Sequence, residues 1–279
     1  MDALIAAGLR RCVVAMRDPH RIVNGRGLAR LRRAGIRVEV GLCGAEARHA
    51  LGGYVHAHLA DRPRVTWKLG MTLDGRIADA RGHSRWITGR PARTHGHRLR
   101  AAADAVVIGA RTALADDPRL TARTRGVRLQ PLRVVCDTRL RLPLTLRLFR
   151  APLARGTVVA CGAGAPATRR RALEARGVTV WTLPLRAGRV SADALAGRLV
   201  AAGCHDVLLE CGARLGSEWL RRHLVHRLAL FVAPRVLGSQ GYGWSGRLGS
   251  GRLEDALRGR LVEQRRVGDD AFLMIEMRR

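Results

Sequence analysis

Short apolar runs alternate with segments of helical pattern along most of the chain, and this alternation constrains the fold more than any other feature. Apolar runs of about four to eight residues are typical of buried strands, and helical segments between them are typical of crossovers between parallel strands. Strands are predicted at 64–71, 104–109, 132–136, 157–161, 178–183, 205–210 and 227–233. Helices are predicted at 90–103, 168–176, 191–202 and 214–223. Two further strands, 261–267 and 271–277, end the pattern, so we expect an α/β fold whose mainly parallel sheet carries a C-terminal antiparallel hairpin.

The N-terminal part carries a smaller pattern of its own. Strands and helices alternate there as a βαβα fragment, at 10–16, 26–34, 36–42 and 45–59. A fragment of this size cannot bury both faces of a sheet alone, so we expect it to pack against the rest of the chain or against another chain. The segment ADRPR, 60–64, is the predicted linker. The sequence therefore predicts two units, 1–62 and 63–279.

The chain is strongly basic, with a formal net charge of +29, which raises nucleic acid as a partner. The arginines are spread along the whole chain, only 4% of residues are aromatic, and no nucleic-acid-binding motif is recognisable. We therefore expect weak nonspecific binding at most and no dedicated nucleic-acid partner. No apolar run is long enough to span a bilayer and the N-terminus lacks a signal-peptide pattern, so we expect no membrane partner and a cytoplasmic location.

The cysteines are expected to be free thiols without catalytic or metal-binding roles. None forms a CxxC pair, and most lie within apolar runs: Cys12, Cys43, Cys136, Cys161, Cys204 and Cys211. Zinc requires clustered ligands, which this spacing does not supply. The sequence therefore predicts no bound metal.

Lysine is almost absent from the chain. Of 51 Lys and Arg residues, only Lys68 is a lysine. Arginine cannot replace a compact, titratable ammonium, so a functional requirement for Lys68 is one explanation, and chance survival of a single lysine is the other.

Several ordered motifs follow the predicted linker: Lys68, LDGR at 73–76, SRWIT at 84–88, HRLR at 97–100 and TALADDPRLTAR at 112–123. Together they resemble the reductase domain of the bifunctional riboflavin-biosynthesis deaminase/reductase family. The similarity continues through 131–143, 208–220, 231–238 and 261–273. Any one motif is weak evidence, but their order and spacing together extend the resemblance from about residue 64 to the end. It implies a fold like that of dihydrofolate reductase.

The N-terminal residues resemble the last third of the cytidine-deaminase-like domain in the same family. Zinc deaminases need an HxE helix and a PCxxC turn to hold the metal and the glutamate that moves protons. Neither motif occurs in residues 1–62. We therefore expect a truncated deaminase domain, without deamination and without zinc, ahead of a complete reductase domain.

The resemblance implies an NADPH-dependent reduction of 5-amino-6-(5-phosphoribosylamino)uracil to its ribitylamino form, with hydride added at the ribose C1. Alternatives are a reductase of another pyrimidine or pteridine, an inactive or regulatory remnant, and an arginine-rich RNA-binding protein. The family also implies a homodimer, and an exposed sheet edge would favour association.

Lys68 and Glu210 are the predicted catalytic residues. Both are expected near the ends of strands, where open α/β sheets bind ligands. We expect a cross-sheet pair in which Lys68 donates a charged hydrogen bond near the reacting sugar. Glu210 would orient the substrate and carry a proton. The alternative is an ion pair with a purely structural role.

Substrate and cofactor contacts are implied by matching motif positions. The substrate positions are Ser84, Arg100, Leu120, Arg123 and Glu210, with the two arginines expected on the phosphate. The cofactor positions are Gly70, Trp86, Thr112, Asp116, Thr138, Gly212, Ala213, Arg214, Leu215, Gly216, Ser217 and Glu218. The last seven follow a predicted strand and open a helix, whose backbone N–H groups favour a pyrophosphate.

Two features of the phosphate-binding prediction stay open. The bulky Arg214 departs from the small residues usual in the family, so it would either bind a cofactor phosphate or obstruct the loop. The turn CGAGAPAT, 161–168, resembles a dinucleotide-binding turn but lacks its third glycine.

Overall fold

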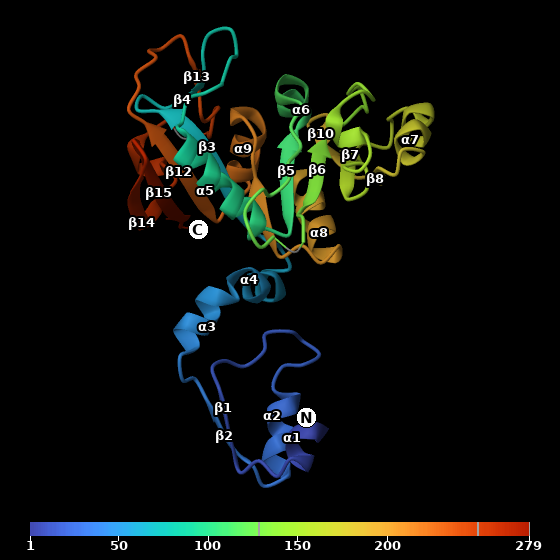
Figure 1. The fold of residues 1–279 in the computed structure, drawn as a ribbon, viewed down its shortest axis with the longest axis vertical. Coiled ribbons are helices and arrows are strands. Elements are labelled where there is room, and N and C mark those ends of the chain that lie inside the picture. Colours follow the sequence, from blue (N-terminus) through green and yellow to red (C-terminus); the bar gives the residue numbers. More distant parts are fainter. Residues whose placement is uncertain (128, 250, 279) are drawn as a thin grey trace. The chain divides into compact units, whose positions relative to one another are not determined.

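The computed structural model describes residues 1–127, 129–249 and 251–278, and the chain divides into two compact units (Figure 1). The units are Met1–Arg64 and Val65–Arg279. The sequence predicts the boundary after residue 62, two residues before the division in the structure.

The first unit contains two parallel strands and four helices. Its elements are α1 (Asp2–Ala6), β1 (Arg11–Val14), α2 (Arg26–Arg33), β2 (Arg37–Val40), α3 (Gly44–Ala50) and α4 (Gly52–Ala60). Strands β1 and β2 pair in parallel, and α2 connects them with Leu28 and Leu31 buried. The single helix predicted over 45–59 is wrong: Leu51 separates α3 from α4. The adjacent Gly52 and Gly53 explain the break, because glycine has a high entropic cost within a helix.

The second unit is built on a nine-stranded sheet in the order β14-β15-β12-β3-β11-β5-β6-β7-β8. These strands are β3 (Arg64–Thr72), β5 (Ala105–Gly109), β6 (Leu132–Cys136), β7 (Thr157–Cys161), β8 (Thr179–Thr182), β11 (Asp206–Leu209), β12 (Arg227–Ala233), β14 (Gly259–Val267) and β15 (Asp270–Met277). Strand β12 pairs in parallel with β3. Strand β5 pairs in parallel with β11 on one side and β6 on the other, and β7 and β8 continue the parallel sheet beyond β6. The hairpin β14–β15 joins β12 in antiparallel register. The mainly parallel sheet with a C-terminal antiparallel hairpin is therefore confirmed.

Helices cover both faces of this sheet. They are α5 (Arg90–Ala101), α6 (Ala110–Asp116), α7 (Ala167–Glu174), α8 (Ala192–Ala201) and α9 (Ala213–Arg221). Side chains of α8 and α9, including Leu195 and Trp219, pack with Trp67 of β3 in one apolar core. Ala92 of α5 packs on the opposite face, with Phe231 of β12. A strand with helices on both faces has no solvent-facing side, which explains the uninterrupted apolar runs in the sequence.

Some short elements carry no clear sequence pattern. The structure adds the helix α6 and the strands β4 (Arg76–Ala78), β9 (Leu185–Arg186), β10 (Arg189–Val190) and β13 (Tyr242–Gly243), with 3-10 turns at Arg147–Phe149 and Leu253–Asp255. Two-residue strands are too short for a period to be detected. Helix α6 ends where Asp117 adopts a left-handed conformation immediately before Pro118. It is therefore only about two turns long, which is also too short for a clear helical period.

Gly216 allows α9 to approach β3 closely. A Cβ at this position would lie 1.9 Å from Cζ2 of the fully buried Trp67. We expect Gly216→Ala to lower the free energy of unfolding by about 1–3 kcal/mol, because the helix or the indole must move. Gly197→Ala in α8 is the matched control, since its Cβ meets nothing within 4 Å and alanine favours a helix. Chemical denaturation would measure both, and equal stability of the two variants would contradict the packing argument.

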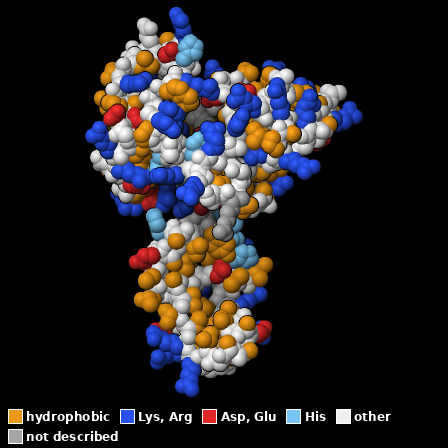
Figure 2. All heavy atoms as spheres, in the orientation of Figure 1, with side chains coloured by type: hydrophobic (Ala, Val, Ile, Leu, Met, Phe, Trp, Pro, Cys, Tyr) orange, Lys and Arg blue, Asp and Glu red, His pale blue; other side chains and the backbone are white. Residues whose placement is uncertain are grey.

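Positive charge is spread over the face that Figure 2 shows, where Lys and Arg side chains lie among acidic and apolar ones. Within the described residues, no helix combines the length and apolarity required to cross a membrane.

Candidate active site

Lys68 lies on the face of the sheet that α5 covers. It is the fifth of nine residues in β3, so the prediction that it lies at the end of a strand is wrong. Its Nζ is 5.9 Å from the centroid of the Phe231 ring on β12. A Cβ on Gly96 of α5 would lie 3.7 Å from its Cε, an ordinary contact distance, so the lysine stem packs against this helix.

Glu210 follows β11, the strand next to β3, and pairs with Arg100 of α5. The Arg100 Nε donates to Oε1 at 2.6 Å and its Nη2 donates to Oε2 at 2.8 Å. The side chains are only 17% and 11% exposed. Among the described residues no ion pair joins Glu210 to Lys68, so the predicted Lys68–Glu210 pair is replaced by a bidentate Arg100–Glu210 pair. Arg100 binds Glu210 through both carboxylate oxygens because the planar guanidinium can donate two parallel hydrogen bonds.

The Arg100 contact keeps Glu210 ionised. Burial alone raises the pKa of the Glu210 carboxyl, but the charge and hydrogen bonds of Arg100 overcome it, and Lys68 and His97 add smaller contributions. The resulting pKa is about 2. Gly96, which borders the Lys68 stem, precedes Arg100 by one turn of α5, so the lysine lies on the same side of that helix as the Arg100–Glu210 pair. A carboxyl with this pKa holds no proton to donate at neutral pH while Arg100 remains in place.

His97 joins Arg123 to the same cluster. The Arg123 Nη2 lies 3.0 Å from His97 Nε2, and Arg100 Nη1 donates to the Thr121 carbonyl at 3.3 Å. Burial, Arg100 and Arg123, in that order, lower the pKa of His97. A neutral imidazole can accept the Arg123 hydrogen bond, whereas an imidazolium would repel the guanidinium. The HRLR motif contains His97, but its sequence predicts a role only for Arg100.

The other two predicted substrate residues differ in exposure. Ser84 is exposed in the loop before α5. Leu120 is 2% exposed, and its side chain belongs to the core beneath α6 and α7. Its φ of 52° is left-handed. Only the Leu120 backbone is therefore available to contact a ligand.

The start of α9 fits the pyrophosphate of a dinucleotide. Gly212 caps the helix in extended conformation, no side chain caps its N–H groups, and the first turn contains no acidic residue. Ala213 opens the helix, and Arg214 is exposed on its first turn. A Cβ at Gly109, the last residue of β5 and the N-cap of α6, would lie 3.6 Å from Leu215. Free backbone donors and an exposed guanidinium together favour an anion at this end of the helix.

Gly216, Ser217 and Glu218, the last three predicted cofactor residues of α9, contact other parts of the protein. Gly216 packs on Trp67, as described above. The Ser217 hydroxyl is buried and accepts from the backbone N–H of Gly246 at 2.8 Å. Glu218 pairs with Arg221, one turn further along the helix. These contacts give Gly216, Ser217 and Glu218 structural roles within the protein.

The other predicted cofactor residues are dispersed around the carboxyl ends of the strands. Gly70 faces Thr88, whose Cγ2 would lie 3.3 Å from an added Cβ. Trp86 is 60% exposed, and the Arg93 guanidinium lies 4.2 Å from its ring centroid. Thr112 is half-buried on α6. The Arg85 guanidinium also lies 5.8 Å from the Trp86 centroid, and the exposed remainder of this side chain suits stacking with a flat ligand.

Asp116 and Thr138 already have partners within the protein. The Asp116 carbonyl accepts from Arg85 Nη2 at 2.6 Å, and its Oδ1 lies 3.4 Å from the same group. The Thr138 hydroxyl accepts from the Val190 N–H at 3.3 Å. The turn at 161–168 is filled by Leu185, which would lie 2.8 Å from a Cβ on Gly162.

Two aspartates that support the site were not found from the sequence. Asp270 is buried and accepts from the N–H of Gly89, the residue that caps α5, at 2.8 Å. Asp74 accepts from the Thr72 hydroxyl and from the N–H groups of Leu237 and Gly238, and these bonds lower its pKa to about 2. The LDG motif contains Asp74, and Thr72 is a local partner, but Leu237 and Gly238 lie more than 160 residues away, beyond any local signal.

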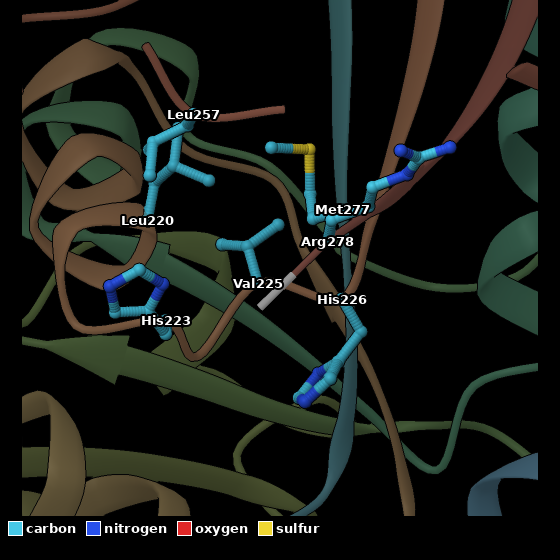
Figure 3. Close-up of a pocket in the computed structure, with 7 residues that line it drawn as sticks. All are labelled: Leu220, His223, Val225, His226, Leu257, Met277 and Arg278. Carbon is cyan, nitrogen blue, oxygen red and sulfur yellow. The ribbon is translucent and has the colours of Figure 1, made fainter. Parts of the chain in front are cut away.

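A small pocket elsewhere in the second unit is too small to be the cofactor site. Figure 3 shows a pocket lined by His223, His226, Met277 and neighbouring residues, which holds about 20 Å³. It lies where β12 begins and β15 ends, away from the carboxyl ends of the parallel strands. A space of this volume accommodates a water molecule, not a dinucleotide.

Residues 63–273 match the family described as the RibD C-terminal domain. The riboflavin biosynthesis protein RibD of Chlamydia muridarum is 39% identical over 244 residues, which cover 86% of this chain and 65% of that protein. The chain thus spans slightly less than two thirds of that relative.

Solved structures agree with this match. RibD of Acinetobacter baumannii, form 1, has a TM-score of 0.90 at 32% identity, covering 100% of this chain and 76% of that one. The diaminohydroxyphosphoribosylaminopyrimidine deaminase/5-amino-6-(5-phosphoribosylamino)uracil reductase of Thermotoga maritima has a TM-score of 0.83 at 26% identity, covering 99% and 74%. The dihydrofolate-reductase-like fold expected from the motifs is therefore confirmed. This chain belongs to the RibD family of riboflavin biosynthesis proteins, and residues 63–273 form its C-terminal domain.

Proposed function

We propose that the chain reduces 5-amino-6-(5-phosphoribosylamino)uracil to 5-amino-6-(5-phosphoribitylamino)uracil with NADPH. The observation that carries the proposal is the convergence of Lys68 with the buried Arg100–Glu210 pair on one face of adjacent strands. The Thermotoga relative, whose name includes this reductase activity, supports the choice of substrate.

Lys68 supplies the positive charge that this reduction needs. An open-chain imine accepts hydride more readily when its nitrogen is protonated or hydrogen-bonded. The Lys68 ammonium can donate such a bond, and it lies 5.9 Å from the centroid of the Phe231 ring. Glu210 is ionised, so it accepts hydrogen bonds from the substrate and orients it rather than giving up a proton.

NADPH, when bound, supplies the hydride. The chain's own contribution is to hold its phosphates at the start of α9, where Gly212 and Ala213 offer uncapped N–H groups. Trp86 provides an exposed aromatic face for a flat ring. The two features fit a dinucleotide better than a small anion, because they combine a phosphate site with a stacking surface.

The proposal is tested by following NADPH oxidation at 340 nm with purified protein and the phosphoribosylamino-pyrimidinedione. Turnover that requires the substrate phosphate supports it. Turnover of folate-like substrates without a phosphate requirement would instead assign another pyrimidine or pteridine. Absence of both activities, with RNA binding that persists at physiological salt, would assign a binding role.

Deamination is not part of the proposed activity. Residues 1–62 lack the HxE and PCxxC motifs, and no group of three or more His, Cys, Asp or Glu residues is placed to hold a metal within the described chain. We propose that this chain alone neither binds zinc nor deaminates the pathway's pyrimidine, which the same assay with the amino precursor would test.

Arg214 is proposed to bind a cofactor phosphate rather than to obstruct the loop, since its side chain is exposed at the start of α9. We expect Arg214→Gln to weaken NADPH binding about tenfold, the effect of losing one charged hydrogen bond. Fluorescence titration with NADPH and NADH measures this. Tighter NADPH binding by the variant would mean that the arginine obstructs the site.

A homodimer is also part of the proposal. Strand β14 is the last strand of the sheet and pairs only with β15 in the described fold, so its other edge presents unpaired backbone groups. Leu261 and Val262 on this strand are exposed. Analytical ultracentrifugation should give about twice the chain mass of 30.5 kDa. A mass equal to one chain at micromolar concentration would contradict the dimer.

A further inference from the structure

The first unit, Met1–Arg64, leaves much more of its apolar surface exposed than the second. Ten large hydrophobic side chains are exposed among its residues, against eleven in the described part of the much longer Val65–Arg279. The apolar clusters of the described residues all lie within the second unit. Hydrophobic side chains cover much of the face of the first unit that Figure 2 shows. Apolar exposure of this density is typical of a binding surface.

The β1–β2 sheet lacks neighbours on its edges and on one face. In the described fold each strand pairs in parallel with the other alone. Val13 of β1 is 43% exposed and lies on the same face as the exposed Arg11–Glu39 ion pair. Val40, the last residue of β2, is 45% exposed, and Leu42 beyond it is 68% exposed. Parallel strands are normally paired along their edges and covered on both faces, so this sheet is suited to join a larger one.

Relatives with the same fold contain additional chain. The match to RibD of Acinetobacter baumannii covers 100% of this chain but 76% of that protein. The match to the Thermotoga protein, whose name includes a deaminase, covers 74% of it. Zinc deaminases require an HxE helix and a PCxxC turn, and residues 1–62 contain neither. The unmatched quarter of these relatives is therefore the part expected to carry both motifs.

We infer that the first unit binds a deaminase-type polypeptide, one that carries the HxE and PCxxC motifs and supplies strands and helices to the β1–β2 sheet. An added strand gains main-chain hydrogen bonds along a free edge, while the exposed valine and leucine side chains gain burial. The polypeptide brings the metal ligands, because no group of three or more His, Cys, Asp or Glu residues is placed to hold a metal in the described chain. The inference does not depend on the proposed reductase function, since every residue assigned to that site lies in the second unit.

The experiment uses the whole chain and one probe. The probe is the segment of Acinetobacter baumannii RibD that has no counterpart in this chain, about a quarter of that protein. The two polypeptides are co-expressed, each with its own affinity tag. Sedimentation velocity over a dilution series gives the composition and Kd of the complex, and hydrogen–deuterium exchange gives the protection of Arg11–Val14 and Arg37–Val40.

Two variants test whether the complex forms at this surface. Leu42→Asp adds a charge in a turn outside the strands, so the fold of the unit is preserved. Val13→Thr keeps the branched shape of the strand residue and adds a polar group. Leu253→Asp is the matched control, since this leucine is 89% exposed in the second unit. We expect Leu42→Asp to raise Kd about tenfold, because one leucine loses its burial, and Leu253→Asp to leave Kd unchanged. Val13→Thr should have a smaller effect in the same direction as Leu42→Asp.

The expected product is an equimolar complex in which amide exchange in both strands is slower than in the chain alone, with reductase turnover the same in all variants. Recovery of the chain without the segment would overturn the inference, as would equal weakening by Leu253→Asp. Protection of both strands in a dimer of this chain, with no segment present, would also overturn it and assign the surface to a second copy. A complex formed by a chain without reductase activity would support the inference and overturn only the proposed function.

Discussion

Lys68→Met is expected to lower kcat for the proposed reduction by about 10²–10³-fold, the usual effect of removing one hydrogen-bond donor aimed at a reacting group. Methionine has nearly the same length as lysine and packs against Phe231 without a charge, so the fold is preserved. Lys68→Arg should be similarly impaired. A guanidinium is a planar, delocalised cation and cannot replace a compact point charge.

Three measurements separate chemistry from folding in this experiment. Steady-state NADPH oxidation gives kcat and KM, titration gives the NADPH affinity, and a thermal melt gives stability. We expect the last two to match the unaltered protein. Full turnover by Lys68→Met would refute the functional role of the lone lysine and leave its survival among 50 arginines as chance.

Arg100→Gln is expected to lower the free energy of unfolding by about 3–5 kcal/mol at pH 7, because it leaves the Glu210 charge buried without its partner. Arg260→Gln is the matched control. Its pair with Glu276 has side chains 61% and 41% exposed, so its loss should cost less than about 1 kcal/mol. Arg100→Gln combined with Glu210→Gln should recover much of the loss, because no buried charge then remains.

The effect of pH follows from the direction of each pKa shift. In the unaltered protein the pKa of Glu210 is lowered to about 2, so its contribution to stability is complete above the unfolded value near 4.5 and is lost as pH falls toward 2. In Arg100→Gln, burial raises the same pKa above its unfolded value. The deficit of that variant should therefore be largest at neutral pH and shrink as pH falls toward about 4.5.

Chemical denaturation of the whole chain between pH 3 and pH 8 measures both effects. A deficit for Arg100→Gln that does not change with pH would mean that Glu210 is not the group left without a partner. A deficit no larger than that of Arg260→Gln would mean that the pair is effectively solvated.

The order of strands and helices was predictable from local patterns, whereas the partners of charged residues were not. Apolar runs identify buried strands because both faces of each strand are covered, as at Ala105–Gly109. Short elements such as α6 lack a detectable period. The break at Leu51 was missed because the apolar pattern continues through the glycine pair.

The candidate site divides in the same way. The motifs placed Lys68 and Glu210 as a pair at strand ends. In the structure Lys68 lies within β3, Glu210 follows the neighbouring strand β11, and Arg100 reaches Glu210 from α5. The sequence therefore paired the wrong cation with Glu210. Both Lys68 and Arg100 are sequence-distant from the carboxylate, and only the packing of α5 across the strands decides which one reaches it.

The sequence by itself determined the family, the α/β pattern and the set of residues that carry charge, since these depend on residue type and spacing along the chain. Tertiary structure decided the contacts. It turned Ser217 into the interior and buried the Leu120 side chain. It also engaged Arg100 with Glu210. The physical reason is that hydrogen bonds and burial depend on distances between segments far apart in sequence, which no local pattern records.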